Sequence, residues 1–267
     1  MRSSSSSRFQ FFLACCLALG LSLVALHGRA QTSTKSKDEG AEFHFARMIY
    51  TDLPQYGGGR GRGRARGWWR QDWPEAEMYF GQAIERLTRI DIGQSVTIDL
   101  LSDDLYDYPW LYATQVGYWS LSDEELAALR EYLARGGFLV VDDFFDQEWG
   151  VFQQTMSRLY PDRPIVEIEP GSEDEILHVV YDLDEKVQIP GLRHLRGYRG
   201  GGFSTMNLPE PHWRGIFDDE GRLIIAINYN MDIGDAWEEA NNPRYPEPMT
   251  ALSYRFAVNY SVYAMTH

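Results

Sequence analysis

The stretch Leu121–Phe144, LSDEELAALREYLARGGFLVVDDF, decides the fold. It opens with Ser122 and, three residues later, Glu125, which is the capping-box pattern of a helix N-terminus. Apolar residues then recur at helical spacing, which predicts one buried helix face. This stripe consists of Leu126, Leu129 and Leu133.

A strand follows this helix directly. Gly136 stands where a C-cap glycine ends a helix, and Gly137–Val141 is then continuously apolar. An unbroken apolar run is typical of a strand that is covered on both faces of its sheet. Before the helix, Pro109–Val116 is also mostly apolar. Strand, helix and strand within this length predict a parallel βαβ unit.

The rest of the chain continues the alternation of strands and helices. Asp218–Gly221 is a turn signal between two apolar runs and predicts a hairpin. We expect an α/β domain with a largely parallel sheet and helices on both faces, spanning residues 43–267. The further strands are expected at residues 43–50, 96–100, 213–217 and 223–229, and the further helices after Pro74 and at residues 149–160 and 250–265.

The N-terminus has the pattern of an export signal. A basic start precedes the apolar run at residues 11–26, and Gly28-Arg29-Ala30 suits signal-peptidase cleavage, so residues 1–30 are expected to be a signal peptide. The alternative is an uncleaved anchor through residues 11–26, although that run is shorter than the roughly 20 residues of a spanning helix. Residues 31–42 are polar and non-periodic, and predict a flexible tether. The protein is therefore expected outside the cytoplasm, periplasmic or extracellular, with membrane contact only through an uncleaved signal.

Composition restricts the function further. The formal charge is −14, and the signal carries three arginines and no acid, so its removal gives −17. Such a charge repels nucleic acid. Both cysteines, Cys15 and Cys16, lie in the signal, so the mature chain offers no thiolate nucleophile or thiolate metal site. The residues predict no cofactor.

In a parallel sheet, ligands bind beyond the carboxyl ends of the strands. Asp142 and Asp143 follow a buried strand there. The pair suits a divalent cation or proton transfer, and it is our candidate for a catalytic site. The alternative is structural, with one aspartate capping the next helix and the other solvated.

A second polar stretch, Asn228–Glu239, follows another apolar strand. Because both stretches follow strands at one edge of the sheet, we expect Asp142 or Asp143 to lie within reach of residues 228–235. Polar groups beside an indole suit a sugar-like or other polar ligand, whereas the alternative is an ordered loop that satisfies its own backbone. With two residues of the Pro109–Val116 strand, the candidate ligand-binding residues are Tyr112, Thr114, Asn228, Asn230, Asp232, Asp235, Trp237 and Glu238.

Two Arg/Gly stretches stand out in this acidic chain. The first, within Gly57–Glu77, carries the candidate anion contacts Arg60, Arg62, Arg64, Arg66 and Arg70. The second is Arg193–Phe203. Arginine pairs bidentately with carboxylate and phosphate, so the stretches suit loops at the rim of a site. The alternative is a pair of solvated Gly-rich insertions.

Four motifs in order, YDYPWLYATQVG (106–117), LSDEELAALREYLARGGFLVVDDF (121–144), GRLIIAINYNMDIGDAWEE (221–239) and the closing helix, resemble the bacterial domain-of-unknown-function family 4159. The resemblance covers residue 43 to the C-terminus. It implies a class I glutamine amidotransferase-like, flavodoxin-like fold and no established reaction. Members often have Thr-Gly-His-Gly after the strand that corresponds to Pro109–Val116, where this chain has Thr114-Gln115-Val116-Gly117, and amidotransferases place a cysteine where this chain has Asp142-Asp143.

Two functions remain open from the sequence. The first is an exported binding or scaffold module without the catalytic cysteine, whose partner is an anionic or glycan ligand or an envelope protein. The second is an envelope hydrolase acting on a glycan or similar substrate, with Asp142 or Asp143 as general base. An enzyme requires a pocket in which carboxyls of perturbed pKa converge.

Overall fold

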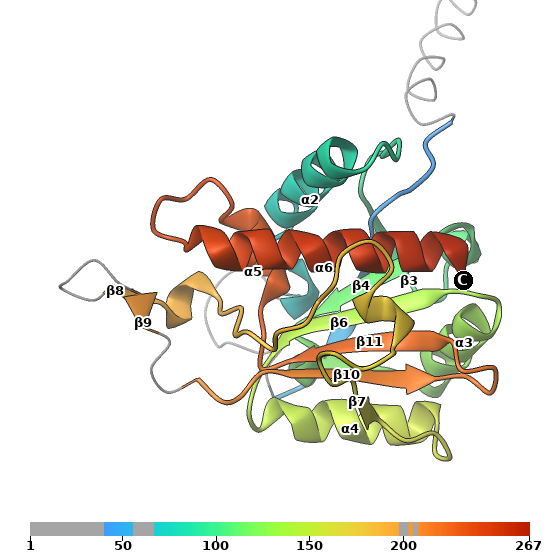
Figure 1. Cartoon of the computed structure of the whole chain (residues 1–267). Helices are drawn as coiled ribbons and strands as arrows, with labels where there is room; N and C mark the ends of the chain where they lie inside the picture. The colour runs from blue at the N-terminus through green and yellow to red at the C-terminus, as the bar shows by residue number, and fades with distance from the viewer. Residues whose placement is uncertain (1–39, 56–66, 198–202, 205–207) are drawn as a thin grey trace, which may run out of the picture. The chain divides into compact units, whose positions relative to one another are not determined.

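The buried strand of the opening stretch lies near the centre of a seven-stranded sheet in a computed structural model (Figure 1). The structure describes residues 40–55, 67–197, 203–204 and 208–267. The predicted signal and nearly all of the predicted tether lie outside these ranges. Residues Ala41–His267 form one compact unit.

The sheet is mostly parallel. In spatial order its strands are β3 (Val96–Asp99), β1 (Ala46–Ile49), β4 (Trp110–Thr114), β6 (Phe138–Phe144), β11 (Leu223–Tyr229), β10 (His212–Phe217) and β7 (Val166–Glu167). The first five run parallel to one another, and β10 runs antiparallel to both β11 and β7. Numbered by their order in the chain, the five parallel strands lie 2-1-3-4-5.

Helices cover both faces of this sheet (Figure 1). One face packs on α2 (Glu75–Leu87), α5 (Ile233–Glu238) and α6 (Glu247–Thr266), and the other on α3 (Asp123–Ala134) and α4 (Glu148–Leu159). Short 3-10 turns complete the chain: η1 (Trp68–Arg70), η2 (Asp103–Asp107), η3 (Val116–Tyr118), η4 (Glu175–Leu177) and η5 (Leu192–His194). Two small ribbons pair β2 (Thr51–Asp52) with β5 (Trp119–Ser120), and β8 (Arg196–Gly197) with β9 (Phe203–Ser204).

The continuous apolar runs are explained by two separate cores. Side chains alternate along a strand, so Tyr112 and Val140 join the core under α2, α5 and α6. Leu111 and Val141 point the other way and join the core under α3 and α4. Both sets are fully buried, and a central strand therefore has no polar face.

The predicted α/β class and the parallel βαβ unit are confirmed. Both bonds of the capping box form: Ser122 Oγ accepts from the Glu125 N–H at 3.2 Å, and Glu125 accepts from the Ser122 N–H at 2.7 Å. Gly136 ends this helix at a φ of +103°, which favours glycine. The hairpin of β10 and β11 is also observed. Strand β6 is longer than predicted, because Asp142 and Asp143 continue it instead of following it.

Within the described ranges, no helix is both long enough and apolar enough to cross a membrane.

Candidate functional site

The carboxyl ends of β4, β6 and β11 bring together side chains from three distant parts of the chain. Asp142 is buried at the end of β6, and its Oδ2 accepts three hydrogen bonds: from the Tyr112 hydroxyl on β4 at 2.8 Å, and from the N–H groups of Ile233 and Gly234 at 2.8 and 2.9 Å. The two N–H groups open α5, so the carboxylate lies at the positive end of that short helix. The expected proximity of Asp142 to the polar stretch after β11 is thus observed.

Asp143 faces a different set of partners. Its backbone is left-handed, with a φ of +52°, and its N–H donates to the Met231 carbonyl. Its Oδ1 accepts from Arg193 at 2.9 Å, and its Oδ2 accepts from the Gln115 amide. Asp143 is 1% exposed, whereas half of the Arg193 side chain is exposed. Arg193 therefore lies between the buried carboxylate and solvent.

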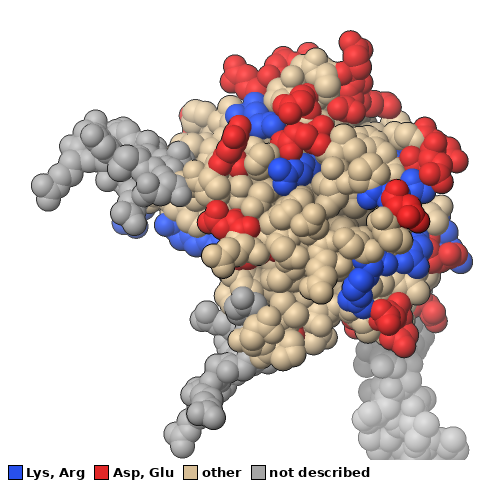
Figure 2. Space-filling view, turned by 90° about the horizontal axis from the view of Figure 1, so that it is seen from below, with Lys and Arg blue, Asp and Glu red and all other residues tan. Residues whose placement is uncertain are grey.

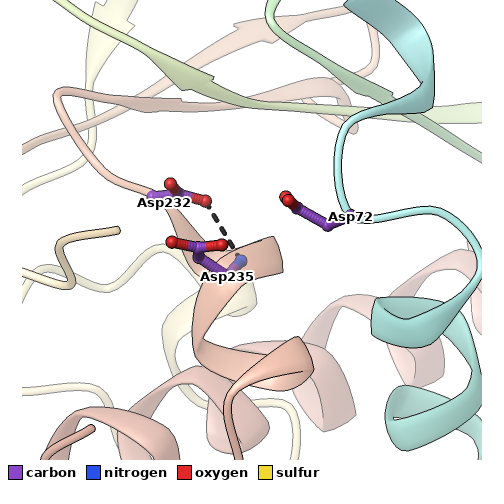
Figure 3. A group of neighbouring side chains, drawn as sticks. All are labelled: Asp72, Asp232 and Asp235. Atoms are coloured by element: carbon purple, nitrogen blue, oxygen red, sulfur yellow. Dashed lines mark hydrogen bonds between the residues drawn. The ribbon is translucent and has the colours of Figure 1, made fainter. Parts of the chain in front are cut away.

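Three further carboxylates converge beside this pair (Figure 3). Asp72 reaches in from the segment between η1 and α2, and Asp232 and Asp235 come from the start of α5. One oxygen of each lies within 4.8 Å of one oxygen of both others. Asp232 Oδ1 also accepts from the Asp235 N–H at 3.1 Å and so caps α5. Glu238, one turn further along α5, is close enough to Asp72 for the two carboxyl groups to interact electrostatically.

Burial makes this group of carboxyls hard to ionise. Desolvation raises the pKa of Asp142 to about 7, although its hydrogen bonds lower it. Burial and the neighbouring charge of Asp72 raise the pKa of Asp235 to about 6, and burial with Asp72 and Asp235 raises that of Glu238 to about 8. Burial also raises the pKa of Asp72, Asp143 and Asp232. Burial thus favours the protonated, uncharged form of these carboxyl groups.

The chain before η5 passes very close to the carboxylates. A Cβ atom added at Gly191 would lie 2.4 Å from Asp232 Oδ2 and 2.9 Å from Asp235 Oδ2. The next residue, Leu192, donates its N–H to Asp235 Oδ2 at 2.5 Å. The φ of Gly191 is −64°, so glycine is required there by the close approach and not by the backbone.

Arg47, on β1, fixes the segment that carries Asp72. It is fully buried, pairs with Glu77 of α2, and donates to the carbonyls of Trp69 and Gln71 at 3.1 and 2.6 Å. Its guanidinium lies 5.0 Å from the centre of the Tyr112 ring. Arg47 thereby links β1, η1 and α2 immediately beside the acidic site.

Backbone strain concentrates around these residues. Within the described ranges, five non-glycine residues have a positive φ, which is uncommon for residues with a Cβ. They are Asp72, Gln115, Asp143, Asp146 and Asn230. Two are carboxylates of the site, Gln115 donates to Asp143, and Asn230 accepts from the Asp146 N–H at 3.1 Å. Such strain is typical of functional sites and is stabilised by the surrounding contacts.

A sequence profile for a domain of unknown function, DUF4159, matches residues 44–265. The chain belongs to the DUF4159 family. The match spans the strands and helices described above, except for the last residue of α6. No curated protein matches the chain.

In this DUF4159 domain the predicted site residues separate into those that lie in the acidic site and those that do not. The acidic site contains Tyr112, Asp142, Asp143, Asp232, Asp235 and Glu238. The Trp237 ring, expected beside a ligand, is 1% exposed, packs against Phe45 and Phe80, and donates to the Ser253 carbonyl at 3.2 Å. Trp237 therefore belongs to the core.

The remaining predicted residues are also buried or lie elsewhere. Thr114 is buried, and its hydroxyl has no hydrogen-bond partner among the described residues. Asn228 accepts from the Tyr260 hydroxyl of α6 at 2.9 Å, and Asn230 donates to the Glu210 carbonyl at 2.8 Å. Arg70 is exposed, with its guanidinium 5.0 Å from the Trp69 ring. Arg60, Arg62, Arg64 and Arg66 lie outside the described residues, and their anion contacts stay a prediction.

Sequence reasoning missed four residues of this DUF4159 site: Arg47, Asp72, Gln115 and Gly191. Arg47 lay within a predicted strand, and its charge in an apolar run was the available signal. Asp72 lay in the first Arg/Gly stretch, where the arginines and tryptophans were the visible signal, and so it was not chosen as a site residue. Gln115 and Gly191 had no local signal, because their roles depend on contacts with distant parts of the chain.

Proposed function

We propose that this DUF4159 domain is an exported binding module that holds a hard divalent cation, such as Ca²⁺ or Mg²⁺, among Asp72, Asp232 and Asp235. The observation that carries the proposal is the convergence of three carboxylate oxygens within 4.8 Å. An ion bound at about 2.0–2.6 Å from each ligand holds neighbouring oxygens no more than about 5 Å apart, and carboxylates are its preferred protein ligands.

The charge balance supports the same function. Six carboxyl groups face one another with Arg193 as their half-exposed cationic neighbour, while Arg47 is already paired with Glu77. Buried carboxylates without compensation are costly, so the group either binds protons or binds a cation. The raised pKa values favour the protonated carboxyl groups when no cation is bound, and a divalent cation would replace these protons.

The proposed cation would also recognise a ligand. Three protein carboxylates that each supply one oxygen leave three positions of a six-coordinate ion open to other oxygens. A glycan hydroxyl or an anionic group fits those positions, and the half-exposed Arg193, whose charge interacts with Asp232 and Asp235, would favour an anion. We extend the proposal to a flavodoxin-like fold, which the strand order 2-1-3-4-5 supports. In that order the ligand crevice lies where β1 adjoins β4, next to the segment that carries Asp72.

The alternative of a hydrolase has less support. Asp142 and Asp143 are 0% and 1% exposed, and both accept hydrogen bonds from several protein donors. A general base has to reach a substrate proton, whereas these two carboxylates fix α5 and Arg193. Amidotransferase chemistry lacks its nucleophile, because the position is occupied by aspartate and not cysteine.

Isothermal titration with CaCl₂, MgCl₂ and MnCl₂ tests the proposal on chelator-treated protein at pH 7.5. We expect one cation to bind the wild type, and the affinity to fall by about tenfold or more in Asp72→Asn and Asp235→Asn, since each removes one charged ligand. Asparagine tolerates the left-handed backbone of residue 72. Asp104→Asn, at an exposed aspartate of η2, is the matched control. Absence of binding, or equal binding by Asp72→Asn and Asp104→Asn, would overturn the proposal.

A further inference from the structure

A cleft separate from the acidic site lies between α4 and the edge of the sheet. Its volume is about 550 Å³, within the range of small-ligand pockets. It is lined by α4, by β7 with the residues before it, and by Arg214 of β10. None of the six carboxyls of the acidic site lines it. Figure 2 shows the face on which α4 lies, where charged side chains surround a broad uncharged area.

Arg214 is held rigidly in this cleft with most of its donors free. Its Nε donates to Glu167 Oε2 at 2.7 Å, and its guanidinium carbon lies 4.4 Å from the centre of the Trp149 ring and 5.3 Å from that of Tyr229. Neither terminal nitrogen has a hydrogen-bond partner within the described part of the chain. The side chain is 20% exposed. A guanidinium fixed by stacking, with its fork unoccupied, is prepared to pair with an oxyanion.

Glu167, which anchors Arg214, has further partners. It also accepts from Lys186 at 2.7 Å and contacts His212 at 2.9 Å. Burial opposes the ionisation of Glu167, but its hydrogen bonds lower its pKa. Arg163, also in the cleft, donates to the Phe217 carbonyl and to Asp219. Of the charged residues that line the cleft, two are arginines and one, Glu167, is acidic.

Part of the remaining lining is apolar. Besides the charged residues and the polar Gln153 and Ser157, the cleft is lined by Met156, Tyr160, Pro161, Pro164 and Ile165. Tyr160 is half-buried, and the Arg163 guanidinium lies 5.4 Å from the centre of its ring. Apolar surface beside fixed polar groups suits a ligand that carries both an anionic group and a ring.

We propose that this cleft is a second binding site, which takes a small organic oxyanion: a phosphate or carboxylate group pairs with Arg214, and an attached ring packs against Tyr160 and Pro164. The site is independent of the proposed cation site. Phosphate and carboxylate share the chemistry that Arg214 recognises, and probes distinguish them.

The test uses the full chain and three probes that share a ring: phenyl phosphate, benzoate and benzyl alcohol, titrated by calorimetry at low ionic strength. We expect at least one anion to bind and the alcohol not to bind. Tighter binding of phenyl phosphate assigns the site to phosphates, and tighter binding of benzoate to carboxylates. Arg214→Gln should weaken the anion by about tenfold or more, because it removes a charged fork. Arg135→Gln is the control, since Arg135 also stacks on a tyrosine, at 4.5 Å from Tyr106, but lies outside the cleft.

A second variant keeps the test decisive if Arg214→Gln does not fold. Gln153→Glu adds a negative charge in the cleft at an exposed position of α4, with no change in side-chain size. We expect it to weaken the anion and to leave thermal unfolding unchanged. No binding of either anion by the wild type, equal binding of the alcohol, or unchanged binding in Gln153→Glu would overturn the proposal.

Discussion

Asp142, at the end of β6, accepts a hydrogen bond of 2.9 Å from the backbone N–H of Gly234, in the first turn of α5. The two residues are 92 positions apart, and this bond connects one strand of the sheet to the helix that follows its neighbour. The same oxygen accepts from Ile233 and Tyr112. Asp142 thus holds together the framework on which Asp232 and Asp235 lie.

We therefore expect Asp142→Ala to lower the free energy of unfolding by about 2–5 kcal/mol, because it leaves three buried donors without an acceptor. Urea unfolding followed by circular dichroism measures the change. The comparison is Thr114→Val, because Thr114 of β4 is paired with Asp142 in the register of the sheet. It removes a buried hydroxyl that lacks a partner within the described residues, so stability should be unchanged or slightly higher. Equal losses in both variants would contradict the role of Asp142.

The buried pair of Arg47 and Glu77 gives a second prediction. Removing one partner leaves the other charge buried, so Arg47→Met should cost about 3–5 kcal/mol of unfolding free energy. The double variant Arg47→Met with Glu77→Leu should recover part of that loss, since no unpaired charge remains. Chemical denaturation of both variants tests this difference. A double variant less stable than Arg47→Met would contradict it.

Gly191 gives a prediction that links cation binding to the packing of the chain around the site. Gly191→Ala places a methyl group against Asp232 and Asp235, while the backbone at that position accepts alanine. Overpacking of this kind costs about 1–3 kcal/mol, and we expect cation affinity to fall together with stability. Gly150→Ala, in α4, has no atom within 4 Å of the new Cβ and should instead stabilise the helix. Calorimetry with CaCl₂ and thermal unfolding are measured on both. Unchanged affinity in Gly191→Ala would show that the carboxylates do not need this close contact.

The raised pKa values predict how stability depends on pH. A carboxyl group with a higher pKa in the folded than in the unfolded chain takes up protons on folding, so its contribution to stability is lost as pH rises between the two values. For Asp142, Asp235 and Glu238 this window runs from ordinary values of 3.8, 3.8 and 4.5 to about 7, 6 and 8. Cation-free protein should therefore be more stable at pH 5 than at pH 8. The lowered pKa of Glu167 acts below its ordinary 4.5, outside this comparison.

Urea unfolding in the presence of a chelator measures the difference between the two pH values. Glu238→Gln should reduce it, because the amide does not titrate. Greater stability at pH 8 than at pH 5 in the wild type would contradict the prediction.

The sequence predicted the sheet because its signals are local. The capping box at Ser122, the apolar run to Val141 and the turn before Leu223 each depend on neighbours in the chain, and parallel strand ends meet at one edge. That rule also predicted that Asp142 would approach Asp232 and Asp235. The composition of the site was less predictable. Asp72 joins the group because Arg47 holds its segment, and Trp237 leaves it because α5 turns the ring into the core.

The five left-handed residues have a consequence for heat resistance. A residue with a Cβ at such a φ costs of order 1 kcal/mol or more relative to an unstrained one, and glycine relieves this cost. Most of these residues either carry a carboxylate of the site or form a hydrogen bond beside it. Substitution by glycine would therefore remove the strain and the polar side chain at the same time. Laboratory evolution for thermal tolerance alone is expected to introduce glycine at these positions early and to remove the proposed cation site before it disturbs either core.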